Sequence, residues 1–246
     1  MFAYTDPYIR SADHLDLLSA GPWQSMAPIV SEALTGIRDG VREIVELGAG
    51  TGLGIRVICD AVPNARIVAI EPSSPLRAVL LHRIASDTDM RSRVTVENQP
   101  FPAARLPESF DALVMINTLG HLDRSAREKL WQVIATGLRT GGCAVINLQQ
   151  PTTSTAVPEF EMAREQVGNR TYHGSAWAER IDDTTMKWHM TYRTSEGSNE
   201  IDATDVEYLW NVIDSRTLEY ELAQHNLRVS ATGDERAGVF VIESSN

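Results

Sequence analysis

The chain has 246 residues, of which 43% are hydrophobic and 22% are charged, a length and composition typical of one large globular domain or two small ones. Its formal charge of -11, without any run of Lys or Arg, argues against nucleic acid or an anionic membrane surface as a partner. The charge is uneven, because residues 1–150 hold 16 acids and 14 bases whereas residues 151–246 hold 17 acids and 8 bases, and this indicates different roles for the two parts.

The two cysteines, Cys59 and Cys143, each lie within an apolar stretch, so they predict neither a disulfide framework nor a cysteine-based metal site. We expect the acids of the second part to be solvated, and we expect no metal. No apolar run approaches the ~20 residues of a membrane-spanning helix, and the N-terminal residues lack the apolar run of a secretory signal. These features predict a soluble cytoplasmic protein.

Residues 11–37 are rich in leucine, isoleucine and valine and are interrupted by Gly21 and Pro22, which predicts two helices packed on the domain that follows. From Arg42 to Leu148, short β-branched runs alternate with segments of helical periodicity, the pattern of a doubly wound α/β domain with a parallel sheet. The predicted strands are residues 43–47, 66–70, 94–97, 112–116 and 143–148, and the predicted helices begin at Leu53, Ser74 and Ser125.

A polar connection, residues 151–158, separates this region from a smaller group of predicted strands. Residues 188–193 and 206–212 are expected to be strands around a turn at 195–199, followed by a helix at 215–225 and strands at 228–232 and 239–243. We therefore predict four parts, which are an N-terminal helical lid (1–40), a ligand-binding core (41–150), a β-rich insert on the substrate side (151–214) and a closing helix with the last strands (215–246).

The most informative segment is VELGAGTGLG, from Val45 to Gly54, which follows a predicted strand and opens a predicted helix. Alternate glycines let the chain turn tightly and let a ligand approach the backbone, while free N–H groups at the helix start face the same crevice. A nucleotide-like ligand is therefore expected there. The G-x-G-x-x-G spacing of NAD-binding proteins does not fit, because Leu53 or Ile55 would take the last glycine position.

The spacing E-x-G-x-G-x-G from Glu46 instead resembles the first motif of the class I S-adenosylmethionine-dependent methyltransferases. Glu71 ends the second predicted strand, where its two oxygens suit two vicinal ribose hydroxyls. Residues 110–122 resemble the family's fourth-strand motif, and residues 138–142 resemble its Leu-x-Pro-Gly-Gly turn with Thr140 in place of proline. The resemblance covers residues 42–148 and implies a Rossmann-like sheet of seven strands, with S-adenosyl-L-methionine as cofactor and S-adenosyl-L-homocysteine as product.

By this resemblance the glycine-rich turn lines the methionine and ribose, Glu46 orients the amino-acid end of the cofactor and Glu71 holds the ribose. Asn98 and Gln99 stand where many relatives have an aspartate that meets the adenine amino group, and amide oxygens can accept that bond. The predicted cofactor-binding residues are Glu46, Gly48, Ala49, Gly50, Gly52, Glu71, Pro72, Asn98, Gln99, Asn117 and His121.

Two histidines are candidates for a catalytic base. His121 follows the fourth predicted strand at the edge where ligands of open α/β sheets bind, and an imidazole there can take a proton from the acceptor. The alternative is that His121 packs over the cofactor, and His173 in the insert is the second candidate. The predicted acceptor-binding residues are Tyr8, His14, Trp23 and Trp177, and plain packing is the alternative for each.

Together these observations predict an enzyme that moves the methyl group of S-adenosylmethionine to an O or N atom of a small molecule, such as a specialised metabolite or a sugar. A small molecule is favoured because the chain has no basic track. The alternative is a protein of the same fold that binds the cofactor but catalyses a non-methylating reaction or only binds a ligand. A monomer and a homodimer both fit the sequence, and the acidic second part favours neutral or cationic acceptors.

Overall fold

The computed structural model describes residues 6–37, 40, 43–233 and 237–245, so the first residues of the predicted lid lie outside the described part. Its larger sheet contains β1 (Glu43–Leu47), β2 (Arg66–Ile70), β3 (Val94–Glu97), β4 (Phe110–Met115), β5 (Leu138–Asn147), β10 (Leu227–Thr232) and β11 (Val239–Ser244). The strand order is β10-β11-β5-β4-β1-β2-β3, and β11 runs antiparallel to both of its neighbours. This arrangement confirms the predicted fold class, with its sheet of seven strands.

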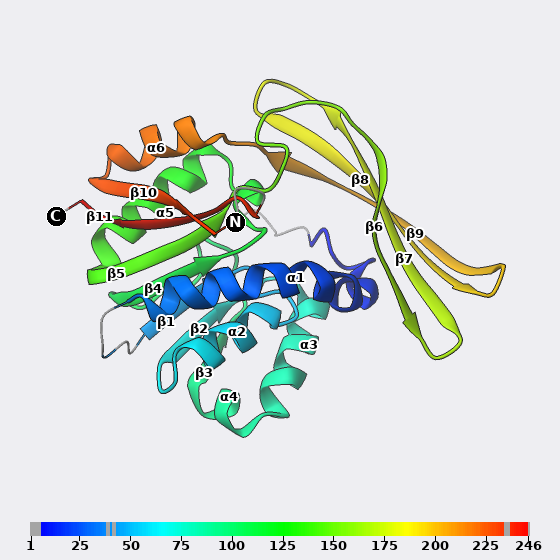
Figure 1. Ribbon diagram of the computed structural model, residues 1–246, viewed down its shortest axis with the longest axis horizontal. Coiled ribbons are helices and arrows are strands. Elements are labelled where there is room, and N and C mark those ends of the chain that lie inside the picture. The colour runs from blue at the N-terminus through cyan, green and yellow to red at the C-terminus, as the bar shows by residue number, and fades with distance from the viewer. Residues whose placement is uncertain (1–5, 38–39, 41–42, 234–236, 246) are drawn as a thin grey trace.

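Helices cover both faces of this sheet (Figure 1). α1 (Ala12–Thr35), α2 (Leu53–Ala61), α3 (Ser74–Ala85) and α4 (Thr88–Arg93) bury side chains against one face, while α5 (Arg124–Gly137) and α6 (Ser215–Ala223) pack on the other. Adjacent strand residues alternate between the two cores, as Ile44 and Val45 of β1 do. Because the chain leaves β1 in one direction along the sheet and β4 in the other, the crevice at their carboxyl ends is the expected ligand site.

α1 is one continuous helix, so the prediction of two helices divided at Gly21 and Pro22 was wrong. Its buried side chains, at Leu18, Met26, Val30 and Leu34, share one face along the whole length. A proline inside a helix costs about 3 kcal/mol because it removes one backbone hydrogen bond. Burial of an apolar face on both sides of Pro22 offsets that cost, and a sequence pattern alone does not show this.

The insert is a separate antiparallel sheet in the order β6-β7-β8-β9, formed by β6 (Val157–Val167), β7 (Arg170–Arg180), β8 (Thr185–Glu196) and β9 (Asn199–Asn211). It projects from the side of the main domain (Figure 1). The sequence predicted parts of β8 and β9 and their turn but missed β6 and β7. β6 is mostly exposed and lacks an apolar alternation, so its pairing with β7 leaves no strand pattern in the sequence.

The inner face of this four-stranded sheet forms a third apolar cluster with α1. It buries Trp188, Tyr192 and Trp210 together with Leu18 from α1. The opposite face, which we call the outer face, carries Trp177, whose ring stacks on that of His189 at 3.8 Å. Among the described helices, none combines the length and apolar character that crossing a membrane requires.

Candidate active site

The glycine-rich turn between β1 and α2 takes backbone conformations that explain its alternating glycines. Gly48, Gly50 and Gly52 have φ of 76°, 55° and 90°, in the left-handed region that side chains with a Cβ rarely adopt. A Cβ at Gly48 would lie 2.2 Å from Thr118 Oγ1, and one at Gly52 would lie 2.7 Å from Leu80. A Cβ at Gly50 would meet nothing within 4 Å, so the turn is closed at both ends and open in the middle.

Glu46, the acid in front of this turn, is 2% exposed, and its Oε2 has no hydrogen-bond partner among the described residues. Burial raises its pKa well above the usual range, and the nearby charge of Glu71 adds to that effect. Gly54 and Trp23 cover the carboxylate, because a Cβ at Gly54 would lie 1.9 Å from Glu46 Oε1 and 2.8 Å from Trp23. A buried carboxylate with an unpaired oxygen calls for a cationic group, such as the ammonium of an amino acid.

Glu71 follows β2 and lies across the turn from Glu46. Its carboxylate accepts hydrogen bonds from the N–H groups of Gly50 and Ser73, each at 2.7 Å. Burial raises its pKa, and the charge of Asp6 in the N-terminal segment raises it further. Arg77 closes the turn around Pro72 by donating to the carbonyl oxygens of Glu71 and Pro72, each at 2.9 Å.

Asn98 and Gln99 are exposed after β3, at the same edge of the sheet. Glu97 Oε1 accepts both of their backbone N–H groups, at 3.0 and 3.2 Å, and Gln99 Nε2 donates to Asn98 Oδ1 at 3.2 Å. Glu97, which is not among the predicted site residues, shapes this turn through these backbone hydrogen bonds. The available signal in the sequence was that Glu97 is an acid at the end of the third predicted strand.

His121 lies in a short 3-10 helix, η1 (Leu119–His121), which follows β4. Its Nε2 lies 2.5 Å from the hydroxyl of Tyr8, and its ring contacts those of Tyr208 at 5.8 Å and Trp210 at 4.9 Å. Burial lowers the pKa of His121 from 6.5 to about 4, so the imidazole is neutral near pH 7. With the phenol as donor, Nε2 is the acceptor and the ring proton lies on Nδ1.

The insert sheet holds the backbone around His121. A Cβ at Gly120 would lie 1.9 Å from the Trp210 ring, so only glycine allows this close approach. Asn211 Nδ2 also donates to the Gly120 carbonyl oxygen at 3.0 Å. These contacts escaped the sequence analysis because 90 residues of chain separate Gly120 from Trp210.

Two predicted acceptor-binding residues of α1 do not lie beside His121's imidazole. His14 is 1% exposed, and its ring nitrogens lie 3.0 Å from Asp13 Oδ1 and 3.2 Å from Thr194 Oγ1. It therefore ties α1 to β8 and has no surface to offer an acceptor. Trp23 packs beside Gly54 and Glu46, on the cofactor side of the site.

His173 and Trp177 of β7 lie on the outer face of the insert sheet, whereas Tyr208 and Trp210 point from its inner side toward His121. His173 Nε2 lies 3.1 Å from Glu161 Oε2, and Trp177 is 39% exposed. The two faces of a sheet are separated by the backbone, so these side chains do not share a site with His121. We therefore retain His121, and not His173, as the candidate base.

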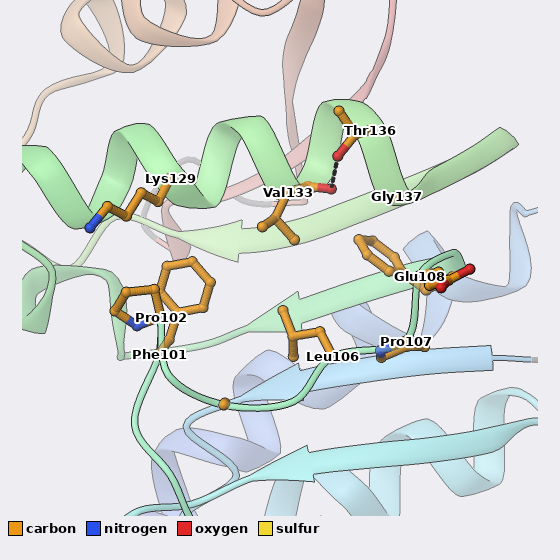
Figure 2. Close-up of a pocket in the computed structure, with 11 residues that line it drawn as sticks. Phe101, Pro102, Leu106, Pro107, Glu108, Lys129, Val133, Thr136 and Gly137 are labelled. Atoms are coloured by element: carbon orange, nitrogen blue, oxygen red, sulfur yellow. Dashed lines mark hydrogen bonds between the residues drawn. The ribbon is translucent and has the colours of Figure 1, made fainter.

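A cavity of about 260 Å³ lies between α5 and the loop that joins β3 to β4 (Figure 2). Phe101, Leu106 and Val133 face one another across it. None of its lining residues belongs to the predicted cofactor or acceptor set. Within the part of the chain that the structure describes, no group of three His, Cys, Asp or Glu side chains could hold a metal ion.

The strand order, with one antiparallel strand beside β5, and the two buried acids around the glycine-rich turn agree with the fold and the first motif that the sequence resemblance implies. Residues 45–144 match the family described as a methyltransferase domain, so this part of the chain is a methyltransferase domain. No curated protein matches the chain.

Solved structures share the fold over nearly the whole chain. The sugar N-methyltransferase KedS8 from Streptoalloteichus is 17% identical, with a TM-score of 0.77 over 100% of this chain and 97% of its own. Streptomyces venezuelae DesVI is 17% identical, with a TM-score of 0.77 over 98% and 100%. CalS10, an amino pentose methyltransferase from Micromonospora echinaspora, is 14% identical, with a TM-score of 0.75 over 98% of both chains. At these identities the likeness shows the fold.

Proposed function

We propose that the protein transfers the methyl group of S-adenosylmethionine to the amino nitrogen of a small molecule, an amino sugar. The observation that carries this proposal is the neutral His121, which lies against Tyr8, Tyr208 and Trp210 at the carboxyl edge of the sheet. Two of the similar structures, a sugar N-methyltransferase and an amino pentose methyltransferase, support the same class of acceptor.

The residues present fit the cofactor. The unpaired oxygen of Glu46 suits the ammonium of the methionine part, and Glu71 has lone pairs left for ribose hydroxyls. The open space at Gly50 lets a ligand approach the backbone between them. Asn98 and Gln99 remain our candidates for the adenine side. When bound, S-adenosylmethionine supplies an electrophilic methyl carbon on a positively charged sulfur.

On the acceptor side, the Tyr8 hydroxyl and His121 Nε2 lie within hydrogen-bond distance of each other. An acceptor must either bind beside this pair or replace one of its members. Nε2 of a neutral imidazole has a single lone pair, and the Tyr8 hydroxyl lies on it at 2.5 Å. An acceptor group that binds His121 therefore exchanges with Tyr8. The aromatic rings of Tyr208 and Trp210 beside it exclude water and suit the apolar face of a sugar ring.

The state of His121 favours nitrogen over oxygen as the nucleophile. A hydroxyl must lose its proton as it attacks, and a base with a pKa of about 4 is a weak partner for that step. A neutral amine already has its lone pair, which forms the N–C bond while the C–S electrons return to sulfur. The N-methylated product then releases one proton. No contact in the described chain favours the non-methylating alternative.

The first experiment is calorimetric titration of the purified protein with S-adenosylhomocysteine, where absence of binding would sink the proposal. The second is incubation with S-adenosylmethionine and two sugars that differ only by an amine in place of a hydroxyl, followed by mass spectrometry. We expect only the amine-bearing sugar to be methylated. Its rate should rise with pH as the acceptor amine loses its proton. Methylation of the hydroxyl-bearing sugar alone would show that oxygen, and not nitrogen, is the nucleophile.

A further inference from the structure

Asn147, the last residue of β5, uses both polar atoms of its side chain on Asn117, which follows the neighbouring strand β4. Its Oδ1 accepts the backbone N–H of Asn117 at 2.6 Å, and its Nδ2 donates to Asn117 Oδ1 at 2.7 Å. Asn147 is 5% exposed, whereas Asn117 is exposed, so these bonds are partly shielded from water. A buried amide with matched donors and acceptors on one partner fixes that partner's position.

Asn117 has a φ of 52°, in the left-handed region. Residues with a Cβ pay roughly 1–2 kcal/mol to adopt this conformation, and asparagine does so more readily than most. The two bonds from Asn147 hold the backbone in this conformation. The chain can therefore reverse direction between β4 and η1 at Asn117, at the carboxyl edge of the sheet.

The segment that begins at Asn117 touches both halves of the active site. The side chain of Thr118 packs on Gly48 of the glycine-rich turn, where a Cβ would lie 2.2 Å from Thr118 Oγ1. The carbonyl oxygen of Thr118 accepts the N–H of His121 at 3.0 Å, which fixes the start of η1. A shift of Asn117 therefore moves one wall of the cofactor turn and the imidazole together.

We infer that Asn147 is a positioning residue, which sets the cofactor turn and His121 through the left-handed backbone of Asn117. This inference rests on the proposed function only in that it requires cofactor binding. Asn147 lies outside the predicted site and reaches it through Asn117.

The test measures the affinity for S-adenosylhomocysteine by calorimetry in Asn147→Ala and Asn147→Asp, beside the thermal unfolding midpoint of each. We expect Asn147→Ala to weaken binding by about 10-fold, the effect of one or two lost buried hydrogen bonds. Asn147→Asp keeps an acceptor for the Asn117 N–H, and the exposed Asn117 amide can rotate to donate its Nδ2 to the second carboxylate oxygen, so the affinity should stay within about 3-fold of the parent. If Asn147→Ala does not fold, Asn147→Ser, which is too short to reach both atoms, takes its place.

Rescue distinguishes positioning from a plain contribution to stability. In an Asn117→Gly background the left-handed backbone carries little penalty, so Asn147→Ala should weaken binding by less than about 3-fold relative to that background. A lower unfolding midpoint with unchanged affinity, or an equal loss of affinity in both backgrounds, would overturn the inference. If the parent protein itself fails to bind S-adenosylhomocysteine, the proposed function fails instead.

Discussion

Glu46 keeps a carboxylate in the interior without a hydrogen-bond partner for one of its oxygens among the described residues. Its pKa is raised in the folded protein above its usual value, so the folded state binds a proton more tightly than the unfolded state does. The stability that depends on this proton is present at low pH and is lost as the pH rises through the folded pKa. Since the charged form of Glu46 does not favour folding, we propose that ligand binding explains why an acid stands there.

Replacing the carboxylate of Glu46 by an amide tests whether ligand binding explains its presence. We expect Glu46→Gln to unfold at a higher temperature than the parent at pH 8 without ligand, by about 2–4 °C for each kcal/mol released, and the gain should vanish below about pH 4. The same variant should bind S-adenosylhomocysteine at least ~10-fold more weakly. Glu43→Gln, on the same strand but half-buried near Arg66, is the matched control and should show neither effect.

His121 gives a prediction of the opposite sign, because burial lowers its pKa from 6.5 to about 4. The stability linked to its neutral form is complete above the unfolded value and is lost as the pH falls through the folded value. The loss amounts to about 3 kcal/mol, since one pKa unit corresponds to about 1.4 kcal/mol.

We therefore expect NMR titration of the His121 ring to show a midpoint near pH 4, and the parent to lose more stability than His121→Gln between pH 7 and pH 5. His82→Gln, at an exposed position of α3, serves as the control and should follow the parent. A His121 midpoint near 6.5 would contradict the assigned burial and would reopen an oxygen acceptor.

Among the elements, the strands of the main domain and its helices α2, α3, α5 and α6 were predictable because local pattern and tertiary role agree there, whereas the short helix α4 was not predicted. β1 and β2 are apolar runs that the sheet buries, and Pro75 stands in the first turn of α3. The prediction failed where distant packing decides the outcome. α1 continues through Pro22 because two cores cover it, and β6 exists because β7 pairs with it.

The residues of the candidate site also divide into those that could be predicted from the sequence and those that could not. Its glycines and acids could be predicted, because their backbone conformations and charges are local properties of a short motif. The roles of Asn147, Gly120 and Trp210 could not, because each depends on a contact between segments far apart in the chain. The sequence also could not show which face of the insert sheet is turned toward His121, and the candidates His173 and Trp177 lie on the other one.

Two helical glycines provide a matched test of packing at this scale. A Cβ at Gly21 of α1 meets nothing within 4 Å, so Gly21→Ala should raise the free energy of unfolding by about 0.5–1 kcal/mol. A Cβ at Gly54 of α2 would lie 1.9 Å from Glu46 Oε1, so Gly54→Ala should lower both stability and affinity for S-adenosylhomocysteine. Denaturant titration and calorimetry measure the two effects, and equal behaviour of both variants would contradict the packing around Glu46.

At the scale of the whole molecule, the insert brings most of the net negative charge beside the proposed acceptor site, because Tyr208 and Trp210 of β9 contact His121. The field of such a surface attracts cations and repels anions, and salt screens it. The prediction compares a cationic amine acceptor with an analogue that differs from it by one added phosphate. We expect KM of the amine to rise with ionic strength and KM of the phosphorylated analogue to fall. Tighter binding of the phosphorylated analogue at low salt would contradict this reading of the charge.

The packing of α1 also limits how the active site can open. Leu18 lies in the core of the insert sheet, and Val30 and Leu34 lie in the core of the main domain, so swinging this helix outward would expose apolar surface in two places. This packing points to residues 6–11, where Tyr8 meets His121, as the segment past which we expect an acceptor to enter. We therefore expect an acceptor to enter by a local exchange at the Tyr8 phenol, with α1 remaining packed on both sheets.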